Sequence, residues 1–359
     1  MDKKRVGILT IHCNYNHGSL LQSFALQSYM ESLGYSVQII NYRPDYLVTK
    51  KPKLYLNVFK PISFFVRLIK YRSLKENFAK FRECEKRLHL TEEVKSTDDI
   101  ERVCRDFDYV VFGSDQIWSR TQTKGDRIWF GKFETGTALK ITYAASAGDL
   151  SFNDEDISNF ATLIGNFSYI SVREKQLSDF IYKVAGKRVP CVLDPTFIMP
   201  RDFWSQWFRP IRDDRYILIR QARISTDARR VVNELSRQLK CKVVSVDSTN
   251  WMLWGAAEQH IYTPFEFISL VKNAECVVTT SFHGLAFSII CNTPFYALKL
   301  NDGQDGRCEG LLNQVGLSHR IIRKGDPVKF EPIDFGNTNN RLFQLRIESQ
   351  SYLKDALTL

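Results

Sequence analysis

The chain has 359 residues, of which 44% are hydrophobic and 25% are charged, and its formal net charge is +10. A chain of this length is too long for one ordinary core and predicts two domains. The composition is typical of a soluble globular protein, and no run of about 18 uncharged apolar residues is long enough to span a bilayer.

The first predicted elements are a strand, a helix and a second strand. Residues 4–11 contain a short apolar run after two cations and predict a strand, and polar residues follow too early for the apolar region of a signal peptide. Apolar residues at helical spacing predict a helix over 19–34, and residues 36–42 predict the second strand. In the connecting loop, Gly18 permits close backbone approach and Ser19 can cap the helix, so its amide groups can meet an anion or sugar hydroxyls. A plain turn remains the alternative.

The next segment, residues 47–88, holds nearly the whole charge excess, with twelve Lys or Arg against three Glu. Its cations are interleaved with Phe, Tyr, Leu and Ile, a pattern that suits a helix lying on an anionic membrane surface. The alternative is an amphipathic helix packed on its own domain, with the cations reaching water. Because the chain carries no recognisable nucleic-acid-binding module, we do not expect nucleic acid as a partner.

The remaining chain continues as two series of apolar strands. The first series has four short apolar runs that end in small or polar residues, as buried parallel strands do: 108–114, 138–148, 166–174 and 190–198. After an aromatic connection near Pro200, the second series alternates strands with helices. Its strands are expected over 215–221, 241–247, 275–281 and 293–300, and its helices over 227–240, 263–274 and from His283. Residues 339–359 predict a final amphipathic helix.

This order of elements predicts an α/β protein with two doubly wound, Rossmann-like domains that face each other across a cleft, the architecture called GT-B among glycosyltransferases. We expect an N-terminal domain over 1–200, a C-terminal domain over 201–335 and a closing C-terminal helix over 336–359. The eight cysteines form no CxxC pair and mostly lie in apolar runs, which indicates reduced thiols in a cytoplasmic protein and no zinc site.

Polar residues gather after the strand expected over 108–114. Ser114 and Asp115 end this strand, and Trp118 follows three residues later. A carboxylate beside an indole is suited to a sugar, because the carboxylate accepts from hydroxyls while the ring covers an apolar face. In the alternative, Asp115 caps the next helix and Trp118 lies in the core.

Arg173 directly follows an apolar run, where its guanidinium must be paired or directed into a cleft because unpaired burial is costly. The planar fork of its donors suits a carboxylate or a phosphate. An ion pair with Glu174 or Asp194 is the alternative. Asp194 precedes Pro195, a pattern that favours a structural turn near the domain boundary.

A single histidine lies where the strand expected over 275–281 gives way to a helix. Ser281 can cap this helix, and Gly284 leaves room for an oxyanion at the free amide groups. At such a position the ring of His283 is suited to donating or accepting a proton near neutral pH. A buried structural histidine remains the alternative.

Four stretches of the chain occur together in one known family: "NYNHGSLLQSFALQ", "GSDQIW", "ISVRE" with the following "VLDPTF", and "TTSFHGLAFSII". In this order and spacing, from about residue 5 to 320, the chain resembles the polysaccharide pyruvyl transferases. The resemblance implies a GT-B-like fold with phosphoenolpyruvate as the donor, held by the C-terminal domain, and a sugar acceptor in the cleft. Many members have Arg-Leu-His where this chain has Ser281, Phe282 and His283, and Arg307 is our candidate for the missing cation.

The resemblance also implies the chemistry of the site. The pyruvate unit moves to two hydroxyls of one sugar, which gives a cyclic ketal and phosphate without a metal or a redox cofactor. We expect His283 to act as acid and base, Arg173 to bind the donor and Asp115 to orient the hydroxyls over Trp118. The acceptor is expected to be a polyprenyl-diphosphate-linked glycan at the inner face of the membrane. Two other functions stay open: a glycosyltransferase that uses a nucleotide sugar, and a non-catalytic protein that binds sugars or docks on membranes.

Overall fold

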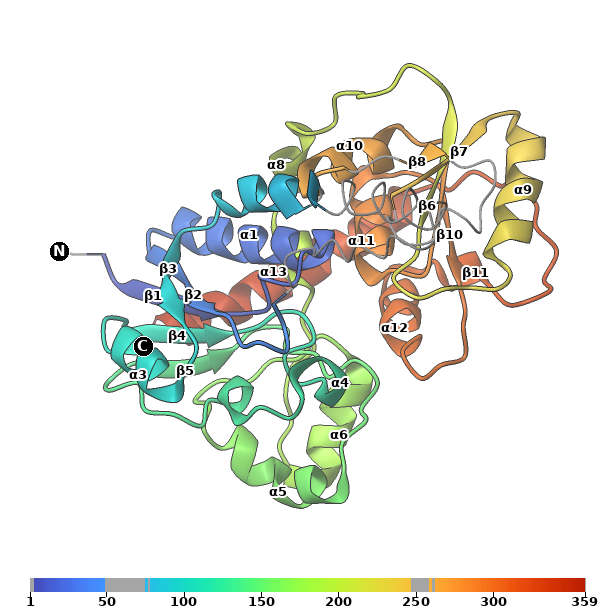
Figure 1. The fold of residues 1–359 in the computed structure, drawn as a ribbon. Helices are drawn as coiled ribbons and strands as arrows, with labels where there is room; N and C mark the ends of the chain where they lie inside the picture. Colours follow the sequence, from blue (N-terminus) through green and yellow to red (C-terminus); the bar gives the residue numbers. More distant parts are fainter. Residues whose placement is uncertain (1–2, 49–74, 77, 247–257, 260–261, 359) are drawn as a thin grey trace, which may run out of the picture.

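The computed structural model describes residues 3–48, 75–76, 78–246, 258–259 and 262–358. The first sheet contains five parallel strands in the order β3-β2-β1-β4-β5 (Figure 1). These strands are β1 (Arg5–Leu9), β2 (Ser36–Tyr42), β3 (Leu90–Val94), β4 (Tyr109–Phe112) and β5 (Leu139–Thr142). Because the winding reverses between β1 and β4, the loops that follow these two strands diverge and leave a crevice at the carboxyl edge of the sheet.

The second sheet repeats this plan with six parallel strands in the order β11-β10-β9-β6-β7-β8. Its strands are β6 (Tyr216–Arg220), β7 (Lys242–Ser245), β8 (Glu258–Gln259), β9 (Cys276–Thr279), β10 (Phe295–Leu298) and β11 (Ile321–Ile322). Here the winding reverses between β6 and β9, so the loop that leads from β9 into the following helix lies at the second crevice.

Helices cover both sheets and join them through one continuous core. In the N-terminal half these are α1 (His17–Ser32), α3 (Thr97–Cys104), α4 (Arg120–Thr123), α5 (Asp154–Ile164), α6 (Lys175–Ala185) and α7 (Pro195–Ile198), with a 3-10 turn over Arg127–Phe130. The later helices are α8 (Arg201–Ser205), α9 (Ala228–Leu239), α10 (Pro264–Asn273), α11 (Phe282–Cys291), α12 (Gly306–Val315) and α13 (Gly336–Leu357), with a 3-10 turn over Ser318–Arg320. The helix α1 packs against α7, α10 and α11, which brings the two halves into direct contact.

The last helix returns to the N-terminal half, so both ends of the chain lie on that side of the molecule (Figure 1). The hydroxyl of Tyr352 donates to the carbonyl oxygen of Thr142 at 2.8 Å, and the amide of Leu193 donates to Ser349 Oγ at 2.9 Å. Leu353 and Leu357 are fully buried in the core shared by the two halves. The closing helix therefore completes the first domain after the chain has built the second.

The predicted fold class, two doubly wound α/β units with a C-terminal helix, is confirmed. Two expected strands of the first series are reduced to isolated bridges at Tyr169, Val172 and Cys191, because small residues and prolines interrupt the ladder there. The sequence reasoning missed β3, since this edge strand carries two glutamates and no apolar alternation. It also missed the helices α5, α6 and α12.

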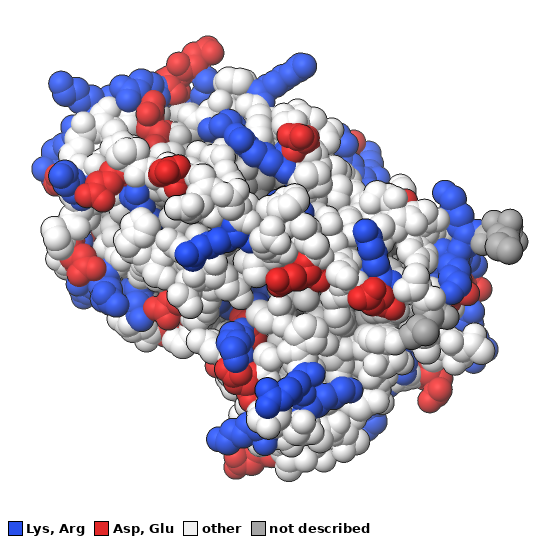
Figure 2. All heavy atoms as spheres, turned by 180° about the vertical axis from the view of Figure 1, so that it is seen from behind, with Lys and Arg blue, Asp and Glu red and all other residues white. Residues whose placement is uncertain are grey.

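Most of the basic segment over 47–88, including residues 49–74 and 77, lies outside the described residues. Its described end packs on the first loop: Phe81 is buried, and its ring centroid is 5.0 Å from that of His17. On the face seen in Figure 2, Lys and Arg side chains are interspersed with Asp and Glu. Among the helices of the described ranges, none is long and apolar enough to cross a membrane. All eight cysteines are free thiols, and five of them are buried.

Candidate active site

The two crevices meet in one pocket of about 500 Å³. Both halves of the chain line it, and the lining includes Asn14, Ser19, Asp115, Ser281, His283 and Arg307. The first three follow β1 and β4, and the next two follow β9, so each group comes from a point where the winding of its sheet reverses. The folding of two parallel sheets against each other thus gathers residues that are far apart in the sequence.

His283 is the second residue of α11, and the helix begins as the sequence predicts. Ser281 is the N-cap, and its Oγ accepts a hydrogen bond from the amide of Gly284 at 3.3 Å. The amide groups in the first turn of a helix have no partners within the helix and attract anions. The ring of His283 therefore lies beside a site suited to a phosphate or a carboxylate.

The other buried histidines have partners within hydrogen-bond distance, whereas Nε2 of His283 lies 3.6 Å from the nearest carboxylate oxygen, that of Asp194. The ring nitrogens of His12 lie 3.1 Å from the carbonyl oxygen of Thr10 and 3.1 Å from Asn41 Oδ1. His17 Nε2 lies 3.0 Å from the carbonyl oxygen of Tyr262, and burial, with the charge of Arg220, lowers the pKa of His17 to about 3. His283 Nε2 has no hydrogen-bond partner among the described residues. This difference favours a functional role for His283 over a structural one.

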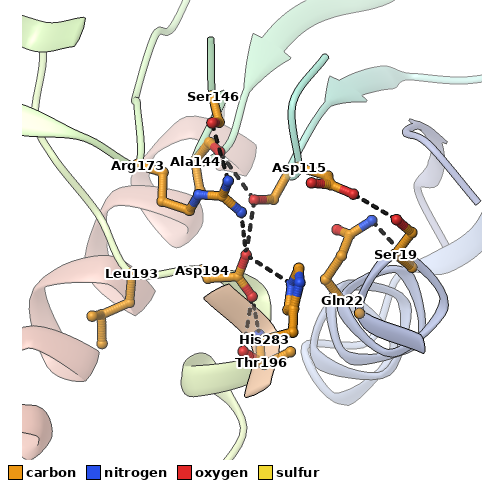
Figure 3. A network of polar contacts seen from close by, with 12 residues as sticks. Ser19, Gln22, Asp115, Ala144, Ser146, Arg173, Leu193, Asp194, Thr196 and His283 are labelled. Atoms are coloured by element: carbon orange, nitrogen blue, oxygen red, sulfur yellow. Dashed lines mark hydrogen bonds and ion pairs between the residues drawn. The ribbon is translucent and has the colours of Figure 1, made fainter. Parts of the chain in front are cut away.

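A buried carboxylate, Asp194, lies next to His283 and joins it to a polar network (Figure 3). The distance from Asp194 Oδ2 to His283 Nε2 is 3.6 Å. The same oxygen accepts from Arg173 Nη1 at 2.8 Å and from Ser114 Oγ at 3.3 Å. Its second oxygen, Oδ1, accepts from the amide and the hydroxyl of Thr196 at 3.0 and 2.8 Å. Asp194 is thus the centre of the network, a role that the sequence analysis missed when it assigned this residue to a turn.

Arg173 is bound within this network. Its Nε donates to Glu174 Oε1 at 2.9 Å, its Nη1 to Asp194 Oδ2 and its Nη2 to Ser146 Oγ at 3.0 Å. The charges of Glu174 and Asp194 overcome burial and raise the pKa of Arg173. A guanidinium carries five N–H groups, and Arg173 also lines a pocket together with Phe282 and Arg307, so direct binding of the donor by Arg173 stays a prediction. The ion-pair alternative describes the geometry, and both carboxylates take part.

The carboxylate of Asp115 faces the pocket from the loop after β4. Its Oδ2 accepts from the hydroxyl of Ser19 at 2.6 Å, and its Oδ1 accepts from the amide of Gln116 at 2.9 Å. Gly113 makes this turn possible: its φ is +118°, and a Cβ there would lie 2.2 Å from the carbonyl oxygen of Tyr143. Ser114 faces Asp194 instead and is fully buried, so it supports the network rather than a bound sugar.

Trp118 does not lie in the pocket, and its expected role under a sugar ring is wrong. Its ring stacks on Phe130 with centroids 5.4 Å apart and planes inclined by 6°, and its Nε1 donates to the carbonyl oxygen of Trp129 at 3.0 Å. The side chain is buried in an aromatic cluster, because the 3-10 turn over Arg127–Phe130 and the helix α5 cover the loop that carries it. The core alternative is the one that the structure supports.

Two predicted glycines are needed for close contacts at the site. A Cβ on Gly18 would lie 2.0 Å from Nδ1 of His283, so only glycine allows the start of α1 to pack on the imidazole. A Cβ on Gly284 would lie 2.4 Å from Thr279 Oγ1, so this glycine lets α11 begin directly above the end of β9. Gly18 thus acts on His283 through packing across the two halves of the chain.

Arg307, the candidate for the missing cation, lies on α12 and lines the same pocket as His283. Among the described residues it makes no ion pair, and its Nε has no hydrogen-bond partner; its Nη2 lies 3.4 Å from Gln304 Oε1. Burial and the nearby charge of Arg173 lower the pKa of Arg307. A half-buried guanidinium without an acidic partner is a suitable binding group for an anionic ligand.

Asn14 also lines the pocket, although the sequence analysis gave it no role. Its Oδ1 is buried and has no hydrogen-bond partner within the described ranges. The only signal in the sequence was its place in the loop after the first strand. No group of three or more His, Cys, Asp and Glu side chains in the described part of the chain is arranged to hold a metal ion.

A model of the polysaccharide pyruvyl transferase family matches residues 16–302, a range that includes Ser19, Asp115, Asp194 and His283. The chain belongs to the polysaccharide pyruvyl transferase family. The predicted resemblance is confirmed, and membership assigns the chain to a family of transferases that act on polysaccharides. No curated protein matches the chain.

Solved structures resemble this pyruvyl transferase family member in fold. A putative UDP-N-acetylglucosamine 2-epimerase from Listeria monocytogenes is 12% identical, with a TM-score of 0.50, over 100% of this chain and 92% of its own. The glycosyltransferase SnogD from Streptomyces nogalater is 14% identical, with a TM-score of 0.47, over 99% and 98%. An O-GlcNAc transferase mutant from Thermobaculum terrenum is 10% identical, with a TM-score of 0.45, over 99% of this chain but 64% of its own. At 12% identity the likeness to the epimerase, with its TM-score of 0.50, concerns the fold alone and agrees with the two α/β units described above.

Proposed function

We propose that this protein transfers a pyruvate unit from phosphoenolpyruvate to two hydroxyls of one sugar in a glycan, forming a cyclic ketal and releasing phosphate. The observation that supports this function best is the pocket itself. It gathers an imidazole at a helix N-terminus, the carboxylate of Asp115 and the unpaired guanidinium of Arg307 in one cavity. One side of the pocket is therefore suited to a donor anion and the other to sugar hydroxyls.

The donor carries a phosphate and a carboxylate, and the C-terminal half supplies groups for both. Arg307 can form charge-assisted hydrogen bonds with an oxyanion, and the first turn of α11 offers amide groups and a positive dipole end. His283, between them, lies where a proton can reach the methylene carbon of the donor. Arg173 supports this arrangement through its bond to Asp194.

The reaction balances with the groups present. His283 gives a proton to the methylene carbon, which becomes a methyl group, and C2 becomes electrophilic. A sugar hydroxyl oriented by Asp115 adds to C2 and loses its proton, which restores the proton on His283. Phosphate then leaves with the electron pair of the C2–O bond, and the second hydroxyl closes the ring while its proton passes to the phosphate. The products are the ketal and inorganic phosphate, with no oxidant or reductant.

The test is phosphate release from phosphoenolpyruvate in the presence of a panel of nitrophenyl and lipid-linked sugars, with the ketal identified by mass spectrometry. His283→Ala should lose nearly all turnover, because a well-placed acid–base group contributes around 10²–10⁴ in rate. The variant should still fold and still bind phosphoenolpyruvate. Retention of more than about a tenth of the parent rate would assign His283 a structural role.

A glycosyltransferase that uses a nucleotide sugar is the second candidate, favoured by the fold alone. In the same assay it would ignore phosphoenolpyruvate and release a nucleotide from a nucleotide sugar. A non-catalytic sugar-binding protein would bind glycans without releasing phosphate or nucleotide. The three functions therefore give three different outcomes.

We further propose that the acceptor is a glycan on polyprenyl diphosphate at the inner face of the membrane. The support is the family, which acts on polysaccharides, and the cations of residues 47–88, which can attract an anionic surface. A protein that rests on the membrane meets a lipid-linked acceptor more often than one that diffuses freely.

A further inference from the structure

Asp194 is a fully buried side chain that contacts His283, and no role in the reaction has been given to it above. Because none of its side-chain surface is exposed, it does not touch a ligand in the pocket. We propose that Asp194 is a positioning residue, which fixes the imidazole of His283 and stabilises the protonated ring for proton transfer to the donor. This inference rests on the proposed function.

The carboxylate cannot rotate, because both of its oxygens are held. Thr196 binds Oδ1 through its amide and its hydroxyl, while Arg173 and Ser114 donate to Oδ2. The oxygen held by Arg173 is the one that lies 3.6 Å from His283 Nε2. A fixed negative oxygen at this distance gives the ring nitrogen one preferred direction.

A second contact from the same network reaches the start of α11. The guanidinium of Arg173 lies over the ring of Phe282, 4.3 Å from its centroid. Phe282 immediately precedes His283, so the network holds both the backbone and the ring of the residue that carries the proton. Gly18 completes the arrangement from α1, because its missing side chain leaves the space that the imidazole occupies.

The charges favour a cation on His283. The buried network contains one cation, Arg173, and two carboxylates, Glu174 and Asp194, so a protonated imidazole neutralises it. Although burial opposes it, the positive charges of His283 and Arg173 lower the pKa of Asp194, so this carboxylate stays ionised. The other charged groups around His283 are Asp115 and Arg307, which line the same pocket, and Arg220, whose Cγ lies beside Gly284.

The test replaces Asp194 with asparagine, which keeps the size and removes the charge. In the full-length protein, Asp194→Asn should lower kcat at least about 10-fold with little change in the KM for phosphoenolpyruvate, because Asp194 acts on proton transfer. The NMR titration of the ring, in protein labelled with ¹³C-histidine, should move to lower pH, because a negative neighbour is lost. Asp156→Asn is the matched control: this buried carboxylate pairs with Arg120 and Arg127 and does not line the pocket, so both measurements should stay at the parent values.

An unchanged or higher titration midpoint in Asp194→Asn, or a loss seen only in KM, overturns the inference. If that variant does not fold, Thr196→Val decides. It removes the hydroxyl that donates to Oδ1 but keeps the charge of Asp194, so the ring should titrate at higher pH, and a midpoint at or below the parent value overturns the inference. The titration needs no turnover. If the parent protein releases no phosphate, the proposed function is wrong. If Asp194→Asn nevertheless lowers the titration midpoint of His283, the electrostatic interaction between these two side chains still stands.

Discussion

Gly18→Ala is expected to remove most of the turnover, although it adds only one methyl group. The added Cβ would lie 2.0 Å from Nδ1, 2.2 Å from Cγ and 2.7 Å from Cβ of His283. Non-bonded heavy atoms normally approach to about 3.5 Å, so the ring or the start of α1 must move by about 1.5 Å. The ring is also the group that Asp194 holds, so any such movement breaks the alignment of His283 with its partner.

The expected magnitude follows from two opposing terms. A misplacement of about 1 Å at a reacting group can cost about 10² in rate. Overpacking of a close contact costs about 1–3 kcal/mol in the free energy of unfolding, while alanine is favoured over glycine in a helix by up to about 1 kcal/mol. Gly18→Ala should therefore lower turnover about 100-fold while destabilising the fold by no more than about 2 kcal/mol.

The assay is phosphate release from phosphoenolpyruvate with a saturating sugar, combined with urea unfolding followed by circular dichroism. Gly310→Ala is the matched control, since this glycine lies in α12 and a Cβ there meets no atom within 4 Å. It should keep the parent turnover and gain up to about 1 kcal/mol of stability. Parent-level turnover in Gly18→Ala would refute the reasoning, because it would mean that the ring tolerates displacement.

Three further predictions concern the donor, the core and the membrane. Arg307→Ala should weaken the binding of phosphoenolpyruvate by about 10- to 100-fold in calorimetry, as expected for the loss of a charge-assisted hydrogen bond. The control Arg323→Ala, which replaces an exposed arginine, should bind with the parent affinity. Equal affinities of the two variants would show that Arg307 does not bind the donor. Trp118→Phe should lower the free energy of unfolding by about 1–3 kcal/mol and leave the KM for the sugar unchanged. A raised KM with unchanged stability would show that Trp118 contacts the sugar. The protein should sediment with anionic but not with zwitterionic vesicles, and high salt should release it. Replacing the cations of residues 47–88 by glutamine should abolish this sedimentation. Equal sedimentation with both kinds of vesicle would contradict the prediction.

Much of the fold could be predicted because its strands are buried on both faces. Runs such as Tyr109–Phe112 and Cys276–Thr279 are continuously apolar, and parallel strands of a doubly wound sheet require this. Since all carboxyl ends of such strands lie at one edge of the sheet, residues that follow different strands can be expected to meet. The family resemblance predicted that Asp115 and His283, which follow strands of different sheets, belong to one site. The pattern of apolar residues did not predict β3, because this edge strand carries two glutamates.

The sequence by itself thus determined the α/β class with two doubly wound units, the family and the helix start that carries His283. Only the tertiary structure decided that Arg173 is bound to two carboxylates, that Trp118 is covered by aromatic rings and that Asp194 lies 3.6 Å from the imidazole. The physical reason is that periodicity records which face of an element is buried, a local property. A buried charged group either pairs with another protein group or binds a ligand. Which of the two occurs depends on the groups that folding brings within a few ångströms of it from distant parts of the chain.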